Sequence, residues 1–270
     1  MAKLDPDLVG ETPQSRIEQA ASLIVGAEYA IALTGAGVST PSGIPDFRSP
    51  GGIWSQVDPV EVGSIWGFRR NPEKFYDFFG RRAGLLRRAE PNSAHLALAE
   101  LEKMGLLKAI ITQNIDRLHQ AAGSRQVIEL HGNMAEMVCL DRGHLTPSGA
   151  VWERYGEDGE VPRCEMCGGL LKPNVILFGE MLPAGAIASA QEEAARSDVF
   201  LAVGSSLEVT PAAELPLAAV RGGAQLIVVN LTPTPADDDA TLVLRGDVAE
   251  VLPQIVETCG RPQGPPLREA

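Results

Sequence analysis

Residues 34–48 read TGAGVSTPSGIPDFR and follow directly on an apolar run at residues 29–33. The apolar run predicts a buried strand, and Gly35 and Gly37 after it predict a sharp turn whose backbone can come close to a bound phosphate. Two prolines further along separate this turn from the immediate helix start of the common dinucleotide-binding fingerprint. We therefore expect a long ordered loop, which presents a carboxylate, an aromatic ring and a guanidinium through Asp46, Phe47 and Arg48.

The rest of the chain alternates between helix and strand patterns. Apolar residues at helical spacing predict helices at 16–24, with Ser15 as a candidate N-cap, and at 71–88, 93–104, 184–196 and 247–258. Short apolar runs predict strands at 29–33, 107–112, 127–130, 175–178, 199–203 and 225–229. This alternation is typical of an α/β fold, so we expect a Rossmann-like parallel sheet with helices on both faces.

Polar side chains follow several of the predicted strands, at the ends where a parallel sheet binds its ligands. Residues 113–116 follow the strand at 107–112, and His131 follows the strand at 127–130. Each of these residues also has a structural interpretation, since Asp and Asn cap turns and a single His is more often a hydrogen-bonded structural residue. Their occurrence together with Asp46 favours a binding site at this edge of the sheet.

Residues 135–173 differ from the rest of the chain. They contain glycines, turn residues and three of the four cysteines, with little helical periodicity. We expect a small inserted module there. The clustering of Cys139, Cys164 and Cys167 indicates metal binding rather than disulfides, given a reducing cytosol.

Length and charge limit the possible classes of protein. A chain of 270 residues can bury a large core and suggests one large domain or a domain with a smaller insert. The net charge of −12 disfavours nucleic-acid binding and favours cationic partners such as lysine-rich protein tails, although it also fits a generally acidic surface. The chain has no secretory signal pattern and no long apolar window, so we expect a cytoplasmic protein that does not contact membranes.

Five motifs give the chain a resemblance to the sirtuin family, the NAD-dependent protein deacylases. Besides residues 34–48, they are TQNIDRL at 112–118, HGN at 131–133, VILFGE at 175–180 and GSSLEVTP at 204–211. The resemblance implies a Rossmann-like NAD-binding domain at 1–134 and 174–258 and a small zinc-ribbon-like module at 135–173. NAD and the acylated lysine side chain of a protein would meet in the cleft between them. The proline-rich residues 259–270 are expected to form a disordered tail.

The resemblance also implies roles for single residues. His131 would be the general base, because imidazole can activate a ribose hydroxyl at neutral pH once nicotinamide has left. Asn114 and Asp116, the other two catalytic candidates, would hold the ribose and nicotinamide together with Gln113. The products would be nicotinamide, free lysine and O-acyl-ADP-ribose. Val175 and Phe178 would grip the acyl-lysine. The residues implied for NAD binding are Gly35, Ala36, Gly37, Ser39, Asp46, Phe47, Arg48, Trp54, Gln113, Asn114, Ile115, Asp116, Gly204, Ser205, Ser206, Asn230 and Val248.

The chain departs from the family pattern at the metal site. The family's zinc ribbon has two Cys-x-x-Cys pairs, whereas the first pair here reads Cys139-Leu-Asp-Arg142, with an arginine in place of the fourth cysteine. Because tetrahedral zinc needs four ligands, His144 is a candidate replacement and Asp141 a weaker one. The alternative is a metal-free module that is held together by packing.

A second departure concerns the acyl group. Family members that prefer succinyl or malonyl groups carry Tyr-x-x-Arg where this chain has Phe79 and Arg82. Arg82 could still pair with a carboxylate in the substrate-binding site. Because Phe79 lacks the hydroxyl group, we expect acetyl or longer neutral acyl groups.

Two other functions stay open at this point. One is a different NAD-consuming activity on the same scaffold, an ADP-ribosyltransferase or NAD hydrolase, which the irregular metal site favours and the presence of His131 disfavours. The other is a non-catalytic module that senses NAD or ADP-ribose. Such a module would be expected to have lost Asn114, Asp116 or His131, and all three are present.

Overall fold

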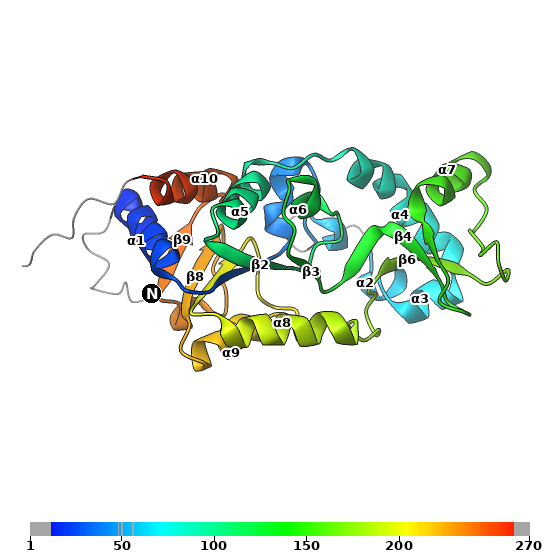
Figure 1. Ribbon diagram of the computed structural model, residues 1–270. Helices are drawn as coiled ribbons and strands as arrows, with labels where there is room; N and C mark the ends of the chain where they lie inside the picture. The colour runs from blue at the N-terminus through cyan, green and yellow to red at the C-terminus, as the bar shows by residue number, and fades with distance from the viewer. Residues whose placement is uncertain (1–11, 48, 50, 56, 262–270) are drawn as a thin grey trace, which may run out of the picture.

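The computed structural model describes residues 12–261 except 48, 50 and 56, and it places two sheets at opposite ends of an elongated molecule (Figure 1). The larger sheet has six parallel strands in the order β3-β2-β1-β7-β8-β9. These strands are β1 (Ala30–Thr34), β2 (Leu107–Thr112), β3 (Val127–Glu129), β7 (Val199–Val203), β8 (Gln225–Asn230) and β9 (Leu242–Arg245). The order reverses between β1 and β7, and ligands of open α/β sheets bind at the carboxyl ends of the strands at such a switch point.

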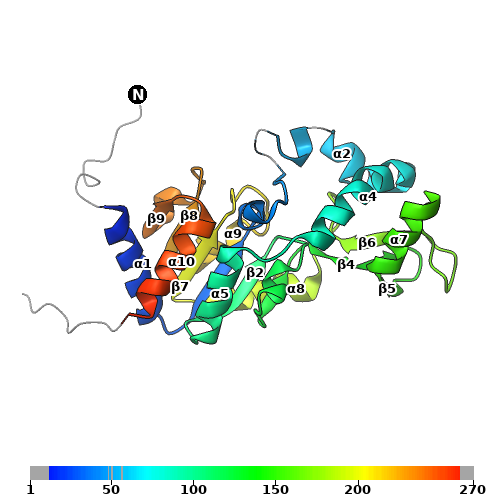
Figure 2. The ribbon, with the colours of Figure 1, turned by 90° about the horizontal axis from the view of Figure 1, so that it is seen from above.

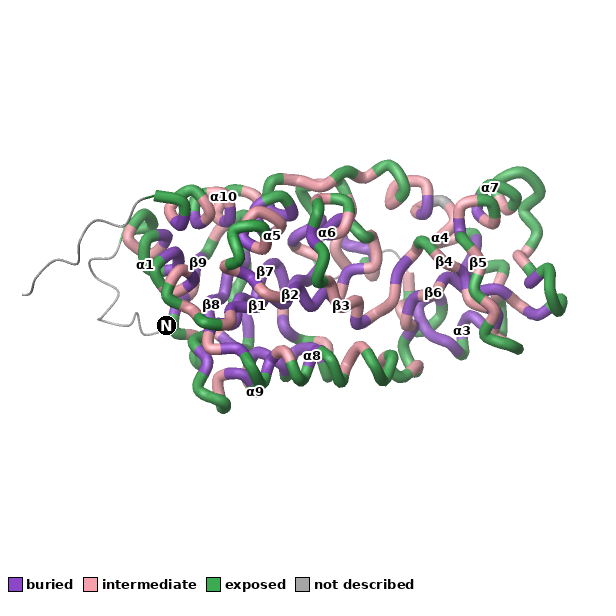
Figure 3. The backbone as a smooth tube through the Cα atoms, in the orientation of Figure 1, coloured by how far each residue is buried: buried purple, intermediate pink, exposed green. Residues whose placement is uncertain are grey.

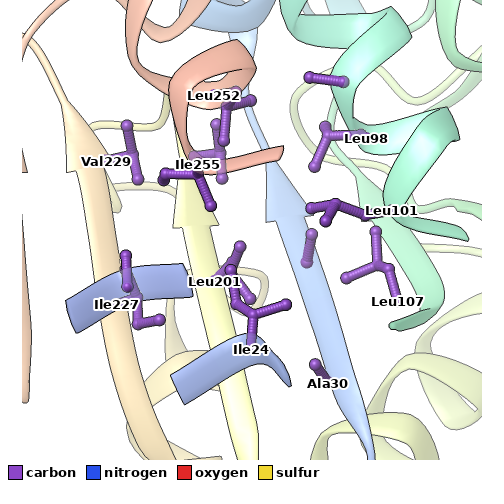
Figure 4. Packing of buried hydrophobic residues seen from close by; sticks show 14 of the residues in the cluster. Ile24, Ala30, Leu98, Leu101, Leu107, Leu201, Ile227, Val229, Leu252 and Ile255 are labelled. Carbon is purple, nitrogen blue, oxygen red and sulfur yellow. The ribbon is translucent and has the colours of Figure 1, made fainter. Parts of the chain in front are cut away.

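Helices cover both faces of this sheet, so the predicted Rossmann-like α/β class is confirmed. Residues of α1 (Pro13–Gly26), α5 (Ser93–Lys103) and α10 (Val248–Cys259) pack on one face, and α8 (Ala184–Arg196) and α9 (Glu214–Arg221) pack on the other (Figure 2). Ile24, Leu101 and Leu252 meet Leu201 and Ile227 of the strands in the first of these layers (Figure 4). β1 and β7 are buried along their whole length, as expected of strands covered on both faces (Figure 3).

The smaller sheet is antiparallel. Its central strand β4 (Gly132–Cys139) pairs with β5 (Leu145–Pro147) and with β6 (Leu171–Val175). α7 (Ser148–Asp158), α3 (Ile65–Arg70) and α4 (Pro72–Arg88) pack around it through buried aromatic rings, and the hydroxyl of Tyr76 donates to the carbonyl oxygen of Leu171 at 2.8 Å. Gly132 pairs with Val175, so the segment that carries the three strands begins and ends at one point.

The remaining elements are short. They are the helices α2 (Pro59–Val62) and α6 (Leu118–Ala121) and the 3-10 turns Ala36–Val38, Thr40–Ser42, Ile53–Ser55 and Asp237–Asp239. Among the residues described, no helix combines the length and the apolar character that crossing a membrane requires.

Three local predictions are wrong. The run 175–178 is not a strand of the large sheet, because Val175 ends β6 and Phe178 forms only an isolated bridge with Ser64. The inserted region, where little helix was expected, contains α7. The N-cap of α1 is Thr12, whose side chain accepts the backbone N–H of Ser15.

Arg48 and residues 262–270 of the predicted tail lie outside the described residues.

Candidate functional site

The carboxyl ends of β1 and β7 meet at the glycine turn that the sequence predicts. The backbone N–H of Gly37 donates to the carbonyl oxygen of Gly204 at 2.8 Å. A Cβ atom on Gly35 or on Gly37 would also lie 2.8 Å from that oxygen. The close contact between the two backbone turns therefore requires glycine at both positions. The expected approach of a phosphate is a separate reason for glycine there.

A cavity of about 720 Å³ opens beside this turn, which is the size of a ligand site. Its walls come from the strand ends of the large sheet, from the loop after β1 and from the segment after β6. The predicted residues that line it are Gly35, Ala36, Gly37, Asp46, Phe47, Trp54, Gln113, Asn114, Ile115, His131, Val175, Phe178, Gly204, Ser205, Ser206, Asn230 and Val248. The structure therefore brings most of the predicted site together.

Three predicted residues line a different, smaller cavity of about 50 Å³ instead. They are Ser39, Asp116 and Arg82. The two cavities share part of one wall, which includes Phe47 and Ile115. The guanidinium of Arg82 lies 3.8 Å from the centre of the Phe78 ring and donates to the carbonyl oxygen of Phe78 at 2.8 Å. Arg82 is thus engaged with its own helix.

Asn114 is held against the glycine turn by its side chain. Its Nδ2 donates to the carbonyl oxygen of Gly35 at 3.0 Å and to Oγ of Ser39 at 3.1 Å. Oγ of Ser39 in turn donates to Oδ2 of Asp116 at 2.6 Å, and Oδ1 of Asp116 accepts the N–H of Leu118 at 2.9 Å. Asp116 therefore binds the first backbone N–H of α6, in keeping with the structural interpretation, and at the same time fixes the hydroxyl that supports Asn114.

His131 has one ring nitrogen engaged. Its Nδ1 lies 2.9 Å from the carbonyl oxygen of Gln113. A carbonyl oxygen only accepts, so Nδ1 carries the proton and Nε2 keeps its lone pair. Burial lowers the pKa of His131 below its usual value, and the bond to Gln113 offsets part of that effect. The imidazole is therefore neutral at pH 7 and can accept a proton at Nε2.

The segment 175–180, which we call the substrate wall, is held from three sides. The N–H of Ile176 donates to the carbonyl oxygen of His131 at 2.9 Å, and the N–H of Phe178 donates to that of Gly63 at 2.8 Å. Nζ of the buried Lys172 lies 2.9 Å from Oε2 of Glu180, and burial lowers the pKa of this lysine while Glu180 opposes the change. The wall is thus tied to the candidate base and to a partly buried ion pair.

Sequence reasoning missed part of the cavity. Leu231, Thr232 and Pro233 after β8 and Gly246 and Asp247 after β9 also line it. The short apolar run at 242–244 was a usable signal for β9, and recognising that strand would have placed the following turn at the same edge of the sheet.

The three cysteines and His144 come together in the small sheet region. One ligand atom from each of Cys139, His144, Cys164 and Cys167 lies within 4.8 Å of the others, with Sγ of Cys139 and Cys167 at 3.4 Å. Ligands about 2.3 Å from a tetrahedral zinc lie about 3.8 Å apart, whereas a disulfide needs about 2.05 Å. The set Cys₃His therefore fits zinc, and the weaker candidate Asp141 is not part of the group.

Comparison with known proteins gives consistent matches. A model of the Sir2 family matches residues 35–211. The chain is similar to NAD-dependent protein deacylase 2 of Archaeoglobus fulgidus, with 50% identity over 252 residues that cover 92% of this chain and 98% of the relative. It is 44% identical over 245 residues to the NAD-dependent protein deacetylase of Thermotoga maritima, which covers 91% of this chain and 99% of the relative.

Solved structures agree with these matches. One is a Sir2 protein with a deacetylated p53 peptide and 3′-O-acetyl ADP-ribose. It is similar to this chain with a TM-score of 0.85 and 44% identity, over 89% of this chain and 97% of that one.

Proposed function

This chain belongs to the Sir2 family and is an NAD-dependent protein deacylase, and we propose that it acts through the cavity described above. The reaction takes NAD, an acylated lysine side chain and one water molecule, and gives nicotinamide, free lysine and O-acyl-ADP-ribose. The observation that carries the site assignment is that a neutral imidazole with a free lone pair, His131, shares one cavity with the glycine turn and the substrate wall.

The cavity residues divide into two groups by position. We propose that the glycine turn and the loops after β7, β8 and β9 bind the dinucleotide, and the size and switch-point position of the cavity support this. NAD supplies a neutral leaving group, nicotinamide, and a ribose that accepts the acyl group. Val175 and Phe178 would bind the acyl-lysine from the opposite side.

The roles of the polar residues follow from their hydrogen bonds. Asn114, fixed by Gly35 and Ser39, would orient the ribose and nicotinamide, and Asp116 would act as a positioning residue because it contacts Ser39 rather than the larger cavity. Nε2 of His131 would accept a proton from a ribose hydroxyl. Enclosure by Phe47 and Trp54, whose ring centres lie 5.4 Å apart, would limit hydrolysis by water.

Two further assignments accompany this proposal. The engagement of Arg82 with Phe78 supports a preference for acetyl or other neutral acyl groups over acidic ones. The Cys₃His group would hold a structural zinc, because its atoms lie outside the cavity. The domain limits 1–134, 135–173 and 174–258 and the cytoplasmic location stay predictions.

Product analysis tests the function directly. The protein is incubated with NAD and an acetyl-lysine peptide, and the products are identified by mass spectrometry. We expect O-acetyl-ADP-ribose and free lysine peptide in equal amounts. Free ADP-ribose alone would indicate an NAD hydrolase, ADP-ribose transferred to protein would indicate a transferase, and no turnover would indicate a sensor.

A further inference from the structure

Two buried histidines that the proposed mechanism does not use lie side by side. His95 of α5 is 0% exposed and His119 of α6 is 1% exposed, and their ring centres lie 5.0 Å apart. Among the residues that the structure describes, each ring has one buried nitrogen without a hydrogen-bond partner, Nε2 of His95 and Nδ1 of His119. Folded proteins rarely leave such atoms unpaired, so these two require an explanation.

The other nitrogen of each ring determines where the proton is. Burial lowers the pKa of both histidines well below 6.5, so both rings are neutral at pH 7. Nδ1 of His95 accepts the backbone N–H of Asn92 at 3.3 Å, which places the proton of this ring on Nε2. His119 donates from Nε2 to Thr34, whose own proton goes to Thr112, so Nδ1 of His119 has a lone pair. A donor without a partner thus lies beside an acceptor without a partner.

His95 is connected to the loop after β1 through the start of its own helix. Asn92, the N-cap of α5, donates from Nδ2 to the carbonyl oxygen of Val38 at 2.8 Å and to Oγ of Ser42 at 2.9 Å. Oγ of Ser42 in turn donates to the carbonyl oxygen of Glu90 at 2.6 Å. The residue that donates to His95 therefore also anchors this loop.

His119 is connected to the other flank of the same loop. Thr112, which follows Thr34 in the chain of bonds from His119, accepts the backbone N–H of Asn114 at 3.0 Å. The side chain of Asn114 donates to Oγ of Ser39, a residue of the loop, at 3.1 Å. A bond between the two histidines would join both flanks of the loop through the interior of the protein.

We propose that Nε2 of His95 donates a hydrogen bond to Nδ1 of His119, and that the two histidines are positioning residues for Asn114 and the loop after β1. The proposal rests on the function proposed above, in which Asn114 orients the ribose and nicotinamide. Pairing the two atoms removes the free-energy loss of leaving both unpaired, and the soft ring torsion of histidine allows it. Neither histidine is among the described residues that line the two cavities, so the pair acts through Asn114.

His119→Phe tests the positioning role, because phenylalanine keeps a ring and removes both nitrogens. We expect nicotinamide exchange by the folded variant to slow about tenfold while KM for the acyl peptide is unchanged. His119→Gln, whose amide can donate to Thr34 and accept from His95, should restore most of the rate. Ser124→Ala is the matched control, since it removes another buried oxygen without a partner, and it should exchange at the parent rate.

Two further measurements separate positioning from stability. Added to Asn114→Ala, His119→Phe should cause little further loss of exchange, because the histidine acts through Asn114. Nitrogen-15 NMR of protein labelled at its four histidines reports which ring nitrogens carry protons. We expect a protonated Nε2 in both rings, and His119→Phe should shift the Nε2 resonance of His95. If His119→Phe does not fold, Thr34→Val breaks the same chain of bonds one step later and takes its place.

Three outcomes would overturn the proposal. A proton on Nδ1 of His119, or a His95 resonance that His119→Phe leaves unchanged, would refute the hydrogen-bonded pair. A parent rate of exchange in His119→Phe, or additive losses in the double variant, would leave the histidines with a structural role alone. If the parent protein exchanges no nicotinamide at all, the proposed function fails and the positioning role with it, whereas the NMR result still decides whether the pair exists.

Discussion

Oγ1 of Thr34 lies 2.8 Å from Nε2 of His119, and this bond connects the last residue of β1 to α6 inside the protein. Thr34 donates its own proton to Oγ1 of Thr112 at 2.9 Å, so His119 must donate from Nε2. Oγ1 of Thr112 accepts the backbone N–H of Asn114 at 3.0 Å. A chain of hydrogen bonds from His119 through Thr34 and Thr112 therefore holds the backbone of Asn114 from the interior of the protein.

The first prediction concerns the stability of this buried network. Burial, together with a smaller effect of the neighbouring His95, lowers the pKa of His119 to about 3. The unfolded state, with a pKa near 6.5, binds more protons, so the free energy of unfolding decreases as pH falls below about 6.5. Between pH 7.5 and pH 5 His119 alone should contribute a loss of about 2 kcal/mol.

Urea unfolding at the two pH values measures this effect. His119→Gln should be less stable than the parent protein at pH 7.5 and should lose less stability on acidification. His95, whose pKa burial lowers to about 4, keeps part of the pH dependence in the variant. Equal slopes in the two proteins would show that His119 is already protonated or exposed in the folded state.

The second prediction concerns the proton acceptor. His131→Ala should lower the deacylation rate about 10²- to 10⁴-fold and leave NAD affinity nearly unchanged, because the imidazole acts after the cofactor is bound. Since burial lowers the pKa of His131, the rate of the parent protein should fall only below pH 6.5, as Nε2 becomes protonated. A loss of NAD affinity as large as the loss of rate would make His131 a structural residue.

The third prediction separates Asn114 from Asp116. Asn114→Ala removes the donor to Gly35 and Ser39 and should lower nicotinamide exchange about tenfold or more. Asp116→Ala should have a smaller effect, because Asp116 acts through Ser39. Gln120→Ala on α6 is the matched control and should exchange at the parent rate. If both variants exchanged nicotinamide at the rate of the parent protein, Asn114 and Asp116 would have only a structural role at the start of α6.

The fourth prediction concerns the metal. Purified protein should hold about one zinc per chain, measured by elemental analysis. His144→Ala should lower the zinc content and the melting temperature, whereas Met166→Ala, which changes an exposed side chain between Cys164 and Cys167, should lower neither. Active protein without zinc, and with a melting temperature that His144→Ala does not change, would show a module held by packing alone.

The fifth prediction concerns the ion pair of the substrate wall. Lys172→Met removes the charged partner of the partly exposed Glu180, which keeps its bond from the N–H of Leu177, and should destabilise the protein by about 1 to 3 kcal/mol. It should also raise KM for the acyl peptide more than KM for NAD, because the pair fixes the substrate wall. Lys172→Arg should restore KM for the peptide. Equal increases in both KM values would mean that the pair contributes only to stability.

The sequence predicted those parts of the site that local pattern determines. Polar residues that follow the strands of a parallel sheet lie at its carboxyl edge, which is why the sequence placed His131 and Asn114 together and both line one cavity. His144 was found by ligand counting, because zinc chemistry restricts the possible residue types.

The errors arose where distant partners determine structure. Residues 175–178 have a strand composition, but pairing of β6 with β4 and the contacts to Gly63 and Ile65 fix their conformation. Ser39, Asp116 and Arg82 line the second cavity rather than the first, between α4 and the loop after β1, and their predicted binding roles stay predictions. No local pattern records that separation.

The paired residues Gly132 and Val175 bear on how such a chain can change over evolutionary time. Gly132 has a φ of +68°, and a Cβ there would lie 2.0 Å from the carbonyl oxygen of Asn174, so this position requires glycine. Both ends of the insert meet at this one pair. Segments of different length and metal content could therefore be exchanged between these residues without a change in the six-stranded sheet, provided that they still cover the aromatic residues of α3 and α4. His131, one residue before the junction, would keep its position through every exchange.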